Sequence, residues 1–251
     1  MTDAELAARL RANLVAYKLF QSERGTLRAL SRPGAWAFAI AEQPDMPHPQ
    51  QVFFTDTGSL RAALPEIEAF YRGLGVRFWR VQVPQGDTAT ARLMQQAGYE
   101  PRQQVPAMGL SLTGAPLQAP RLTPEPLETL RELVLLNAQE SGPLVRIPIL
   151  PWHSEPQPSM HLLGLREGGQ LLSGGMAYDA GDTTAIYLMA TASSARGRGL
   201  ASDVMRGLLL AARARGLAAA VLQSTPVGHG LYRRLGFKDL ELWTSWVRPV
   251  N

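Results

Sequence analysis

The sequence predicts an α/β (α+β) protein with a mixed, mostly antiparallel sheet that is flanked by helices. The apolar residues 185–190 indicate a strand, which a glycine-bearing turn joins to an Ala/Leu/Arg-rich helix over residues 200–215. Upstream, Gly168-Gly169 and Ala180-Gly181 each separate two apolar stretches, as in β-hairpins. A similar order of helix, strand, short helix and Gly-aromatic pair occurs in the N-terminal half, which predicts two tandem copies of one fold.

The N-terminal half is expected to alternate between helices and strands. Leu6, Leu10 and Leu14 recur at helical spacing, and prolines and glycines separate the later elements. The predicted elements are a helix over residues 4–20, strands over 34–40 and 51–54, a helix over 59–71, a strand over 78–83 and a helix over 88–96.

The C-terminal half follows a predicted linker. Residues 112–120 contain glycine and proline without any periodic pattern. Thr123-Pro124-Glu125 then predicts the start of a helix that carries Leu127 inward, because Thr is a suitable N-cap and Pro fits the first helical position. Strands are expected over residues 161–166, 171–178, 184–191, 217–224 and 240–247.

The turn Arg196-Gly197-Arg198-Gly199-Leu200-Ala201 carries the clearest chemical signal. Glycine lets the backbone approach a ligand closely. The first N–H groups of the following helix have no internal partner and lie at the positive end of its dipole. With two arginines beside them, these groups favour a phosphate-bearing ligand.

This turn resembles motif A of the GNAT acetyltransferase superfamily, Gln/Arg-x-x-Gly-x-Gly/Ala, whose specified positions are filled by Arg196, Gly199 and Ala201. Residues 231–237, Leu-Tyr-Arg-Arg-Leu-Gly-Phe, resemble the Leu-Tyr-x-x-x-Gly-Phe signature of the same family. The resemblance begins near Leu122, and its specific part covers residues 196–237. It implies the GNAT fold.

The resemblance also implies that acetyl-CoA binds as the co-substrate. The N–H groups of the turn would bind its pyrophosphate, and the preceding strand would pair with its pantetheine arm. Thr225 stands where many relatives have an asparagine that touches the cofactor, and Tyr232 matches the general acid that protonates the departing thiolate. A phenol with an ordinary pKa of about 10 can act as such a donor. The implied cofactor-binding residues are Met189, Ala190, Thr191, Arg196, Gly197, Arg198, Gly199, Leu200, Ala201, Ser202 and Thr225.

No catalytic base is evident in the sequence. Many relatives carry a glutamate on the strand before motif A, but Thr184, Ile186 and Tyr187 occupy that region here. His161 is one candidate base. The others are His153, Glu155 and Glu140. A base that acts through water, or an amine that arrives neutral, remains open. Residues 141–158, with five prolines, lie where the family lines its acceptor site.

The N-terminal copy lacks both signatures. Met94 stands where Tyr232 stands in the second copy, and Thr55-Asp56-Thr57-Gly58 replaces the arginine-bearing turn. An aspartate at this place would repel a pyrophosphate. We therefore expect a degenerate GNAT-like domain over residues 1–115 and an acetyltransferase domain with the acetyl-CoA site over residues 121–251.

Composition excludes several classes of protein. Cysteine is absent, which rules out a disulfide framework, a zinc-thiolate site and an acyl-cysteine intermediate. The net charge of +4 comes mainly from arginine, and the closest cluster of arginines falls on helices already assigned to other roles. A nucleic-acid surface would instead gather basic residues, interleaved with aromatic ones, on one face. No uninterrupted apolar stretch reaches the roughly 18 residues of a membrane span. Residues 1–6 are not expected to form a signal peptide, because they show no basic region followed by an apolar core. We expect a cytoplasmic monomer or homodimer that binds no nucleic acid, membrane or metal.

Together these observations predict an acetyl-CoA-dependent N-acetyltransferase. It would transfer the acetyl group directly to a primary amine of a small-molecule or peptide acceptor. The alternative is a non-catalytic acyl-CoA-binding regulatory protein. The missing base favours this alternative, and Tyr232 argues against it.

Overall fold

The computed structural model describes residues 1–45, 49–140 and 150–248. The chain divides into two compact units. Unit 1 combines Met1–Asn13 with Met108–Leu240, and unit 2 combines Leu14–Ala107 with the residues after Leu240. Each unit thus contains segments from both halves of the chain. The expected domains, residues 1–115 and 121–251, remain a prediction.

Unit 1 contains a mixed, mostly antiparallel sheet flanked by helices, as predicted. Neighbouring strands in it are β6, β7, β8, β9 and β10, and only the β9–β10 pair among these is parallel. The elements are β6 (Glu125–Pro126), α4 (Leu130–Glu140), η1 (Pro151–Ser154), β7 (Met160–Glu167), β8 (Gln170–Ala180), β9 (Thr183–Thr191), η2 (Ser193–Ala195), α5 (Leu200–Ala214), β10 (Ala219–Gln223) and α6 (Pro226–Arg234).

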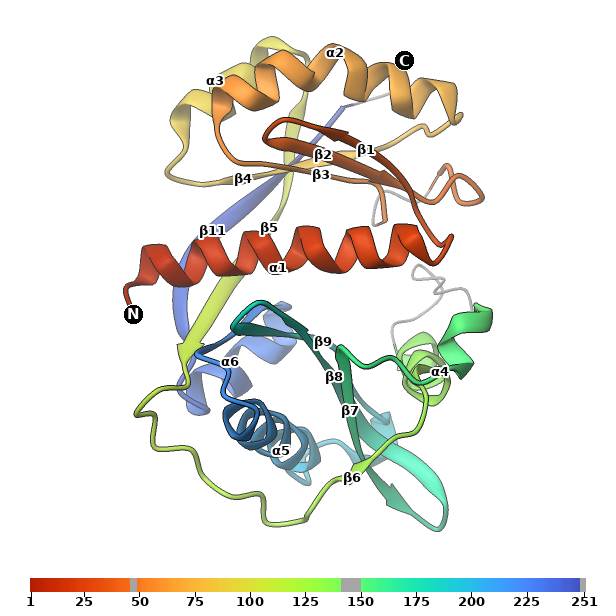
Figure 1. Cartoon of the computed structure of the whole chain (residues 1–251), viewed down its shortest axis with the longest axis vertical. Helices are drawn as coiled ribbons and strands as arrows, with labels where there is room; N and C mark the ends of the chain where they lie inside the picture. The colour runs from red at the N-terminus through yellow and green to blue at the C-terminus, as the bar shows by residue number, and fades with distance from the viewer. Residues whose placement is uncertain (46–48, 141–149, 249–251) are drawn as a thin grey trace. The chain divides into compact units, whose positions relative to one another are not determined.

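Helices α4 and α5 cover opposite faces of this sheet (Figure 1). Gly174 and Gly175 are neighbours in β8, so their missing side chains point to opposite faces. A Cβ on Gly174 would lie 3.0 Å from Leu133 of α4, and one on Gly175 would lie 3.3 Å from Leu208 of α5. The two glycines therefore let both helices pack closely against the centre of the sheet.

Unit 2 contains a smaller sheet that is likewise mostly antiparallel. Tyr71 stacks on Trp79 in its core, with ring centroids 4.9 Å apart, and donates hydrogen bonds to the carbonyls of Phe38 and Gln51. Helices α2 and α3 lie over the same face of its strands (Figure 1). The elements are β1 (Arg28–Arg32), β2 (Ala35–Ala39), β3 (Gln51–Phe54), α2 (Thr57–Gly73), β4 (Arg80–Pro84) and α3 (Thr88–Gln96), and the first helix, α1 (Asp3–Glu23), contributes residues to both units.

The final strand of each copy belongs in part to the other unit. β5 (Glu100–Ser111) follows α3, and its end lies in unit 1, where β10 is its neighbour. β11 (Lys238–Val247) follows α6, and its end lies in unit 2, where it pairs antiparallel with β4. Trp243 in this part of β11 is only 1% exposed. The two copies have therefore exchanged the ends of their last strands.

The helix predicted to begin at Thr123 begins at Leu130, so this prediction is wrong. Glu125–Pro126 form strand β6 and pair antiparallel with β7. A residue before proline is pushed toward extended backbone, and this stretch holds two X-Pro pairs in succession. Leu127 is buried as expected, but it lies outside the helix.

Candidate functional site

Strands β9 and β10 separate toward their carboxyl ends. Their parallel pairing runs from Thr183 and Ala219 to Ala185 and Val221, whereas β9 continues to Thr191. Within the described residues, no pairing between the two strands extends beyond Ala185. The carboxyl ends of parallel strands lie at one edge of a sheet, so the turns after β9 and β10 lie at the same edge. The open part of β9 and these two turns form the candidate site.

A β-bulge lies on the open part of β9. The register with β8 shifts there, so that Leu188 and Met189 stand opposite Gly175. Leu188 has a φ of 51° and is the only non-glycine residue in the described ranges with a positive φ. Nδ2 of Asn137 in α4 donates hydrogen bonds to the carbonyls of Leu188 (2.8 Å) and Leu133 (2.9 Å). The helix thus fixes the strained bulge.

Met189 and Thr191 present backbone groups to the open edge of β9. Along a strand, the N–H and C=O groups of successive residues point to alternate sides. The Ala190 carbonyl accepts a hydrogen bond of 3.1 Å from the hydroxyl of Ser173 in β8, and the Ala192 N–H donates to the Leu172 carbonyl of β8 at 2.8 Å. Of the three residues expected to pair with pantetheine, Ala190 is therefore used within the sheet, and the other two face away from β8. The Thr191 carbonyl accepts a bond of 3.4 Å from Nε of Arg196.

The turn between β9 and α5 presents N–H groups without internal acceptors. Gly197 and Gly199 have φ values of 78° and 81°, and Gly199 is the N-cap of α5. No acceptor in the described part of the chain meets the N–H groups of residues 197–201. The Ser202 N–H, by contrast, donates to the Gly199 carbonyl at 3.0 Å. Such a group of N–H donors at a helix N-terminus suits a phosphate.

Arg196 and Arg198 are paired with carboxylates. Nη2 of Arg196 lies 2.6 Å from Glu140, which also accepts the N–H of Ser193 at 3.0 Å. Nη2 of Arg198 lies 2.9 Å from Glu167, and this contact lowers the pKa of the Glu167 carboxyl. Arg198 and Glu167 are both exposed, so this ion pair adds little stability, and Arg198 can exchange the carboxylate for a phosphate at small energetic cost. Arg196 is exposed too, but its partner Glu140 is only 18% exposed.

Helix α6 begins at the second turn, after β10. Thr225 is its N-cap, and Oγ1 of Thr225 accepts the N–H of Gly228 at 3.2 Å. Tyr232 is buried on this helix, where its ring packs edge-on against Phe237 with centroids 6.0 Å apart. Burial raises the pKa of Tyr232 to about 12. The phenol therefore stays protonated at neutral pH, which a proton donor requires.

His161 lies away from the open edge of β9. It belongs to β7, which lies two strands, or about 10 Å, from that edge. Its Nε2 is 3.0 Å from Asp179, which also binds Arg215 beyond the last turn of α5. Burial and the charge of Arg215 lower the pKa of His161, although Asp179 opposes them. His161 therefore lies near the C-terminal end of α5, whereas the turn with the open N–H groups lies at its N-terminal end.

The other candidate bases are engaged or exposed. Nδ1 of His153 accepts the N–H of Leu150 at 3.1 Å, and burial lowers the pKa of His153 to about 4. A neutral histidine that accepts at Nδ1 carries its proton on Nε2, so it has no lone pair left to act as a base. Glu140 binds Arg196, and Glu155 is exposed. Residues 141–149 of the expected acceptor region lie outside the described residues.

The N-terminal copy has a carboxylate where the second copy has open N–H groups. Asp56 is the N-cap of α2 and accepts hydrogen bonds from the N–H (2.9 Å) and the hydroxyl (2.7 Å) of Ser59. These bonds, with one from Thr55, lower the pKa of Asp56 to about 2. The helix end that would face a pyrophosphate therefore carries a negative charge. Met94, which aligns with Tyr232, lies fully buried in the core of unit 2.

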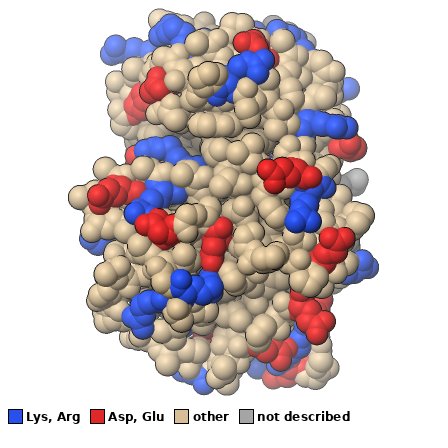
Figure 2. All heavy atoms as spheres, viewed as in Figure 1, with Lys and Arg blue, Asp and Glu red and all other residues tan. Residues whose placement is uncertain are grey.

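Charged side chains of both signs are interspersed on the face of the molecule in Figure 2. Basic groups of unit 1 pair with acids, as Arg166 does with Glu125 and Glu132. The face in view thus has no broad basic surface of the kind that binds nucleic acid. Within the three described ranges, no helix is both long and apolar enough to cross a membrane.

Residues 127–237 match the model of the acetyltransferase (GNAT) family. The matched range contains the splayed strands, the turn after β9 and helix α6. Asn137 also lies within it, although no sequence pattern had marked this residue. The Gly174-Gly175 pair was the available sign of the bulge, since glycine inside a strand often marks one. No curated protein gives a significant match to the chain.

Several solved structures resemble the whole chain. A GCN5-related N-acetyltransferase from Kribbella flavida is 16% identical, with 96% of each chain covered and a TM-score of 0.69. Another from Sphaerobacter thermophilus is 17% identical, over 87% of this chain and 77% of that one, with a TM-score of 0.63. A tandem GNAT protein from the clavulanic acid biosynthesis pathway is 10% identical, over 86% and 78%, with a TM-score of 0.62. These likenesses confirm the predicted fold of two tandem copies.

Proposed function

We propose that this acyltransferase, which matches the model of the acetyltransferase (GNAT) family over residues 127–237, moves the acetyl group of acetyl-CoA directly to a primary amine. The observation that carries the proposal is the group of open N–H donors at residues 197–201, beside a splayed strand. The donors suit a pyrophosphate. The unpaired strand edge suits an extended arm with amide groups, which can add to a sheet edge as a strand does.

The pyrophosphate binds at the turn before α5. Its oxygens accept from the backbone N–H groups, and Arg196 and Arg198 exchange Glu140 and Glu167 for phosphate oxygens. These charge-assisted bonds are stronger than neutral ones. Thr225, at the N-terminus of α6, lies at the same edge of the sheet and completes this end of the site.

The thioester lies along the open edge of β9. Backbone groups of Met189 and Thr191 hydrogen-bond the pantetheine amides. The Met189 N–H, next to the fixed bulge, donates to the thioester oxygen as the amine nitrogen attacks the carbonyl carbon. The amine attacks in its neutral form, the C–N bond forms, and negative charge develops on that oxygen. The nitrogen, now positively charged, then loses a proton to water.

Tyr232 completes the transfer. The tetrahedral intermediate breaks its C–S bond, and the phenol gives its proton to the departing sulfur, so that the products are the amide and free CoA. The phenolate then takes a proton from water, which replaces the one released by the amine nitrogen. The chain has no cysteine to carry the acetyl group in between. In a direct transfer both substrates are bound together before reaction, which gives sequential and not ping-pong kinetics.

Acetyl-CoA binding is the first test. The proposal predicts that acetyl-CoA raises the unfolding temperature and binds one molecule per chain in calorimetry, because Asp56 blocks the corresponding helix end in the N-terminal copy. At one hundred times the dissociation constant, the added stability is about 2.7 kcal/mol. S-acetylpantetheine, which lacks the phosphates, serves as the matched ligand and should bind far more weakly. Absence of any stabilisation by acetyl-CoA would refute the proposal.

Turnover of an amine panel is the second test. Thiol release from acetyl-CoA is followed with small amines, amino acids and peptides, in the wild type and in Tyr232→Phe. The variant should lose about a hundredfold or more in kcat, while its affinity for acetyl-CoA stays the same. Tight binding of acetyl-CoA without transfer to any amine would instead support the non-catalytic regulatory protein.

A further inference from the structure

The buried carboxylate of Asp203 lies in the first turn of α5, which directly follows the proposed phosphate-binding turn. The Asp203 side chain is 0% exposed. An anion at this position stabilises the helix end by itself, but it also repels a second anion bound at the same N–H groups. The site can therefore hold a pyrophosphate only if the charge of Asp203 is neutralised.

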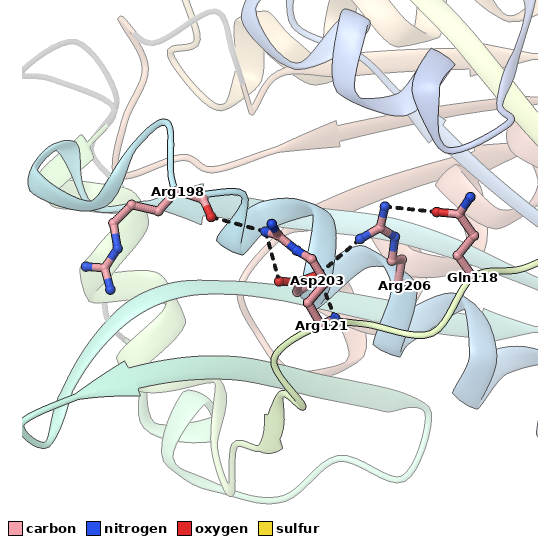
Figure 3. Close-up of polar contacts among 5 residues, drawn as sticks. All are labelled: Gln118, Arg121, Arg198, Asp203 and Arg206. Atoms are coloured by element: carbon pink, nitrogen blue, oxygen red, sulfur yellow. Dashed lines mark hydrogen bonds and ion pairs between the residues drawn. The ribbon is translucent and has the colours of Figure 1, made fainter.

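Two arginines supply that neutralisation (Figure 3). Arg206, one turn along α5, places Nη1 3.1 Å from Asp203. Arg121, far away in the sequence, donates its backbone N–H to Asp203 at 3.1 Å and places Nη2 3.4 Å from the other carboxylate oxygen. Burial alone would raise the pKa of Asp203, but the hydrogen bonds and charge of Arg121 outweigh it and the pKa is lowered.

Arg121 also lies against the turn itself. Its Nη2 donates to the carbonyl of Arg198 at 3.2 Å, and a Cβ on Gly199 would clash with the same nitrogen. The side chain is nevertheless 64% exposed. One guanidinium thus connects the buried carboxylate, the peptide of the turn and the solvent from which a phosphate arrives.

The segment that carries Arg121, residues 115–121, is hydrogen-bonded to side chains of α5. Arg213 donates to the carbonyl of Ala115 at 2.9 Å, and Arg206 donates to Gln118 at 3.0 Å. The stretch predicted to be a linker is therefore held at several points along this helix. Arg121 itself lies outside the residues that match the family model.

We propose that Arg121 is a positioning residue of the acetyl-CoA site, which neutralises Asp203 so that the N–H groups of the turn can donate hydrogen bonds to the pyrophosphate. The inference rests on the proposed function. The proposed role of Arg121 differs from a direct contact between this arginine and a phosphate, because Arg121 acts through Asp203. Removal of the negative charge should therefore make Arg121 dispensable.

A charge-rescue experiment tests this. Calorimetry measures acetyl-CoA binding to the wild type, Arg121→Ala, Asp203→Asn and the double variant, with circular dichroism to check that each is folded. Arg121→Ala should weaken binding roughly ten- to a hundredfold. The double variant should return to within roughly threefold of the wild type. Arg213→Ala, which releases the same segment at the far end of α5, is the matched control and should bind normally.

Each other outcome has a distinct meaning. If Arg121→Ala binds acetyl-CoA as well as the wild type, the inference is overturned while the proposed function stands. If the double variant binds as weakly as Arg121→Ala, neutralisation of Asp203 is not the role of this arginine, and the inference is again overturned. If the wild type itself does not bind acetyl-CoA, the proposed function fails and the inference falls with it.

Discussion

At Gly199 the backbone has a φ of 81°, and Nη2 of Arg121 fills the space that any other side chain would need. Both features oppose substitution, one through backbone strain and the other through the displaced arginine. We predict that Gly199→Ala weakens acetyl-CoA binding about tenfold or more, as measured by calorimetry on folded protein.

Gly216 offers a matched control for that variant. It lies just beyond the other end of α5 with a φ of 84°, and nothing lies within 4 Å of the position of its Cβ. Gly216→Ala thus brings similar backbone strain without the clash. Equal loss of affinity in the two variants would show that the contact with Arg121 does not matter.

Asn137 supports the bulge from outside the strand. Asn137→Ala leaves the Leu188 carbonyl without its donor, so we predict a loss of about 1–3 kcal/mol in the free energy of unfolding. Because the bulge orients the Met189 N–H, kcat should fall more than the affinity for acetyl-CoA. Urea unfolding and steady-state kinetics measure the two effects.

Asn13 provides the comparison for Asn137. Its Nδ2 donates to the carbonyls of Tyr178 and Thr183, near the other end of β9, and its Oδ1 accepts the hydroxyl of Tyr187 at 3.1 Å. Asn13→Ala should lower stability to a similar degree, but kcat should fall less than in Asn137→Ala, because Asn13 does not bond to the backbone of the bulge. If the two variants have the same kcat, the bulge does not contribute to catalysis as proposed.

The sequence could mark the turn, whose residues remain a predicted binding site, but not the residues that support it. Residues 196–201 are contiguous, so a local pattern contains the open N–H groups and the two arginines beside them. Asn137 acts on a strand that comes some fifty residues later in the chain, and only the packing of α4 brings them together. No local pattern could reveal that contact, and the same holds for Arg121.

Among the elements, η1 contains a histidine that the fold keeps neutral. The pKa of His153 falls from 6.5 to about 4 through burial. Between pH 4 and pH 6.5 the folded state therefore binds fewer protons than the unfolded chain. The contribution of His153 to the free energy of unfolding is complete above pH 6.5 and is lost as the pH falls toward 4. The largest loss that this group can cause is about 3 kcal/mol.

A variant isolates this contribution. His153→Asn keeps an acceptor for the Leu150 N–H but does not titrate. We predict that the wild type loses more stability than this variant between pH 7 and pH 4.5, by chemical unfolding at each pH. If the wild type and the variant lose the same amount of stability between these two pH values, burial does not lower the pKa of His153 in the folded protein.

Elements with regular apolar patterns were predicted closely, and those with mixed patterns were not. The helix expected over 88–96 matches α3, and both hairpins of unit 1 are present. β1 was missed because its sequence, Arg-Ala-Leu-Ser-Arg, is mostly exposed and has no apolar run. β5 was missed because Pro101 and Pro106 interrupt it, and proline usually argues against a strand.

At the scale of the whole molecule, each unit depends on residues from both halves of the chain. We predict that fragments 1–115 and 121–251, expressed separately, do not fold stably. The first lacks the strand that pairs with β4 and its buried Trp243, whose loss alone costs about 3–5 kcal/mol. The second lacks β5 beside β10.

Circular dichroism and amide chemical-shift dispersion measure the fold of each fragment and of their mixture, which should regain structure. A fragment 121–251 that folds alone and binds acetyl-CoA would contradict the prediction. The sequence could not reveal the strand exchange. β5 and β11 each follow a Gly-aromatic pair, and their local patterns fit either copy equally well.

The exchanged end of β11 also sets the timing of folding during protein synthesis. A domain near the N-terminus ordinarily folds while the ribosome is still translating the rest of the chain. Here the strand that pairs with β4 spans residues near Val247, so unit 2 stays incomplete until they have left the exit tunnel. Until then the nascent chain carries β4 with an unpaired edge, to which other chains can add. The first copy to be translated is thus the last to be finished.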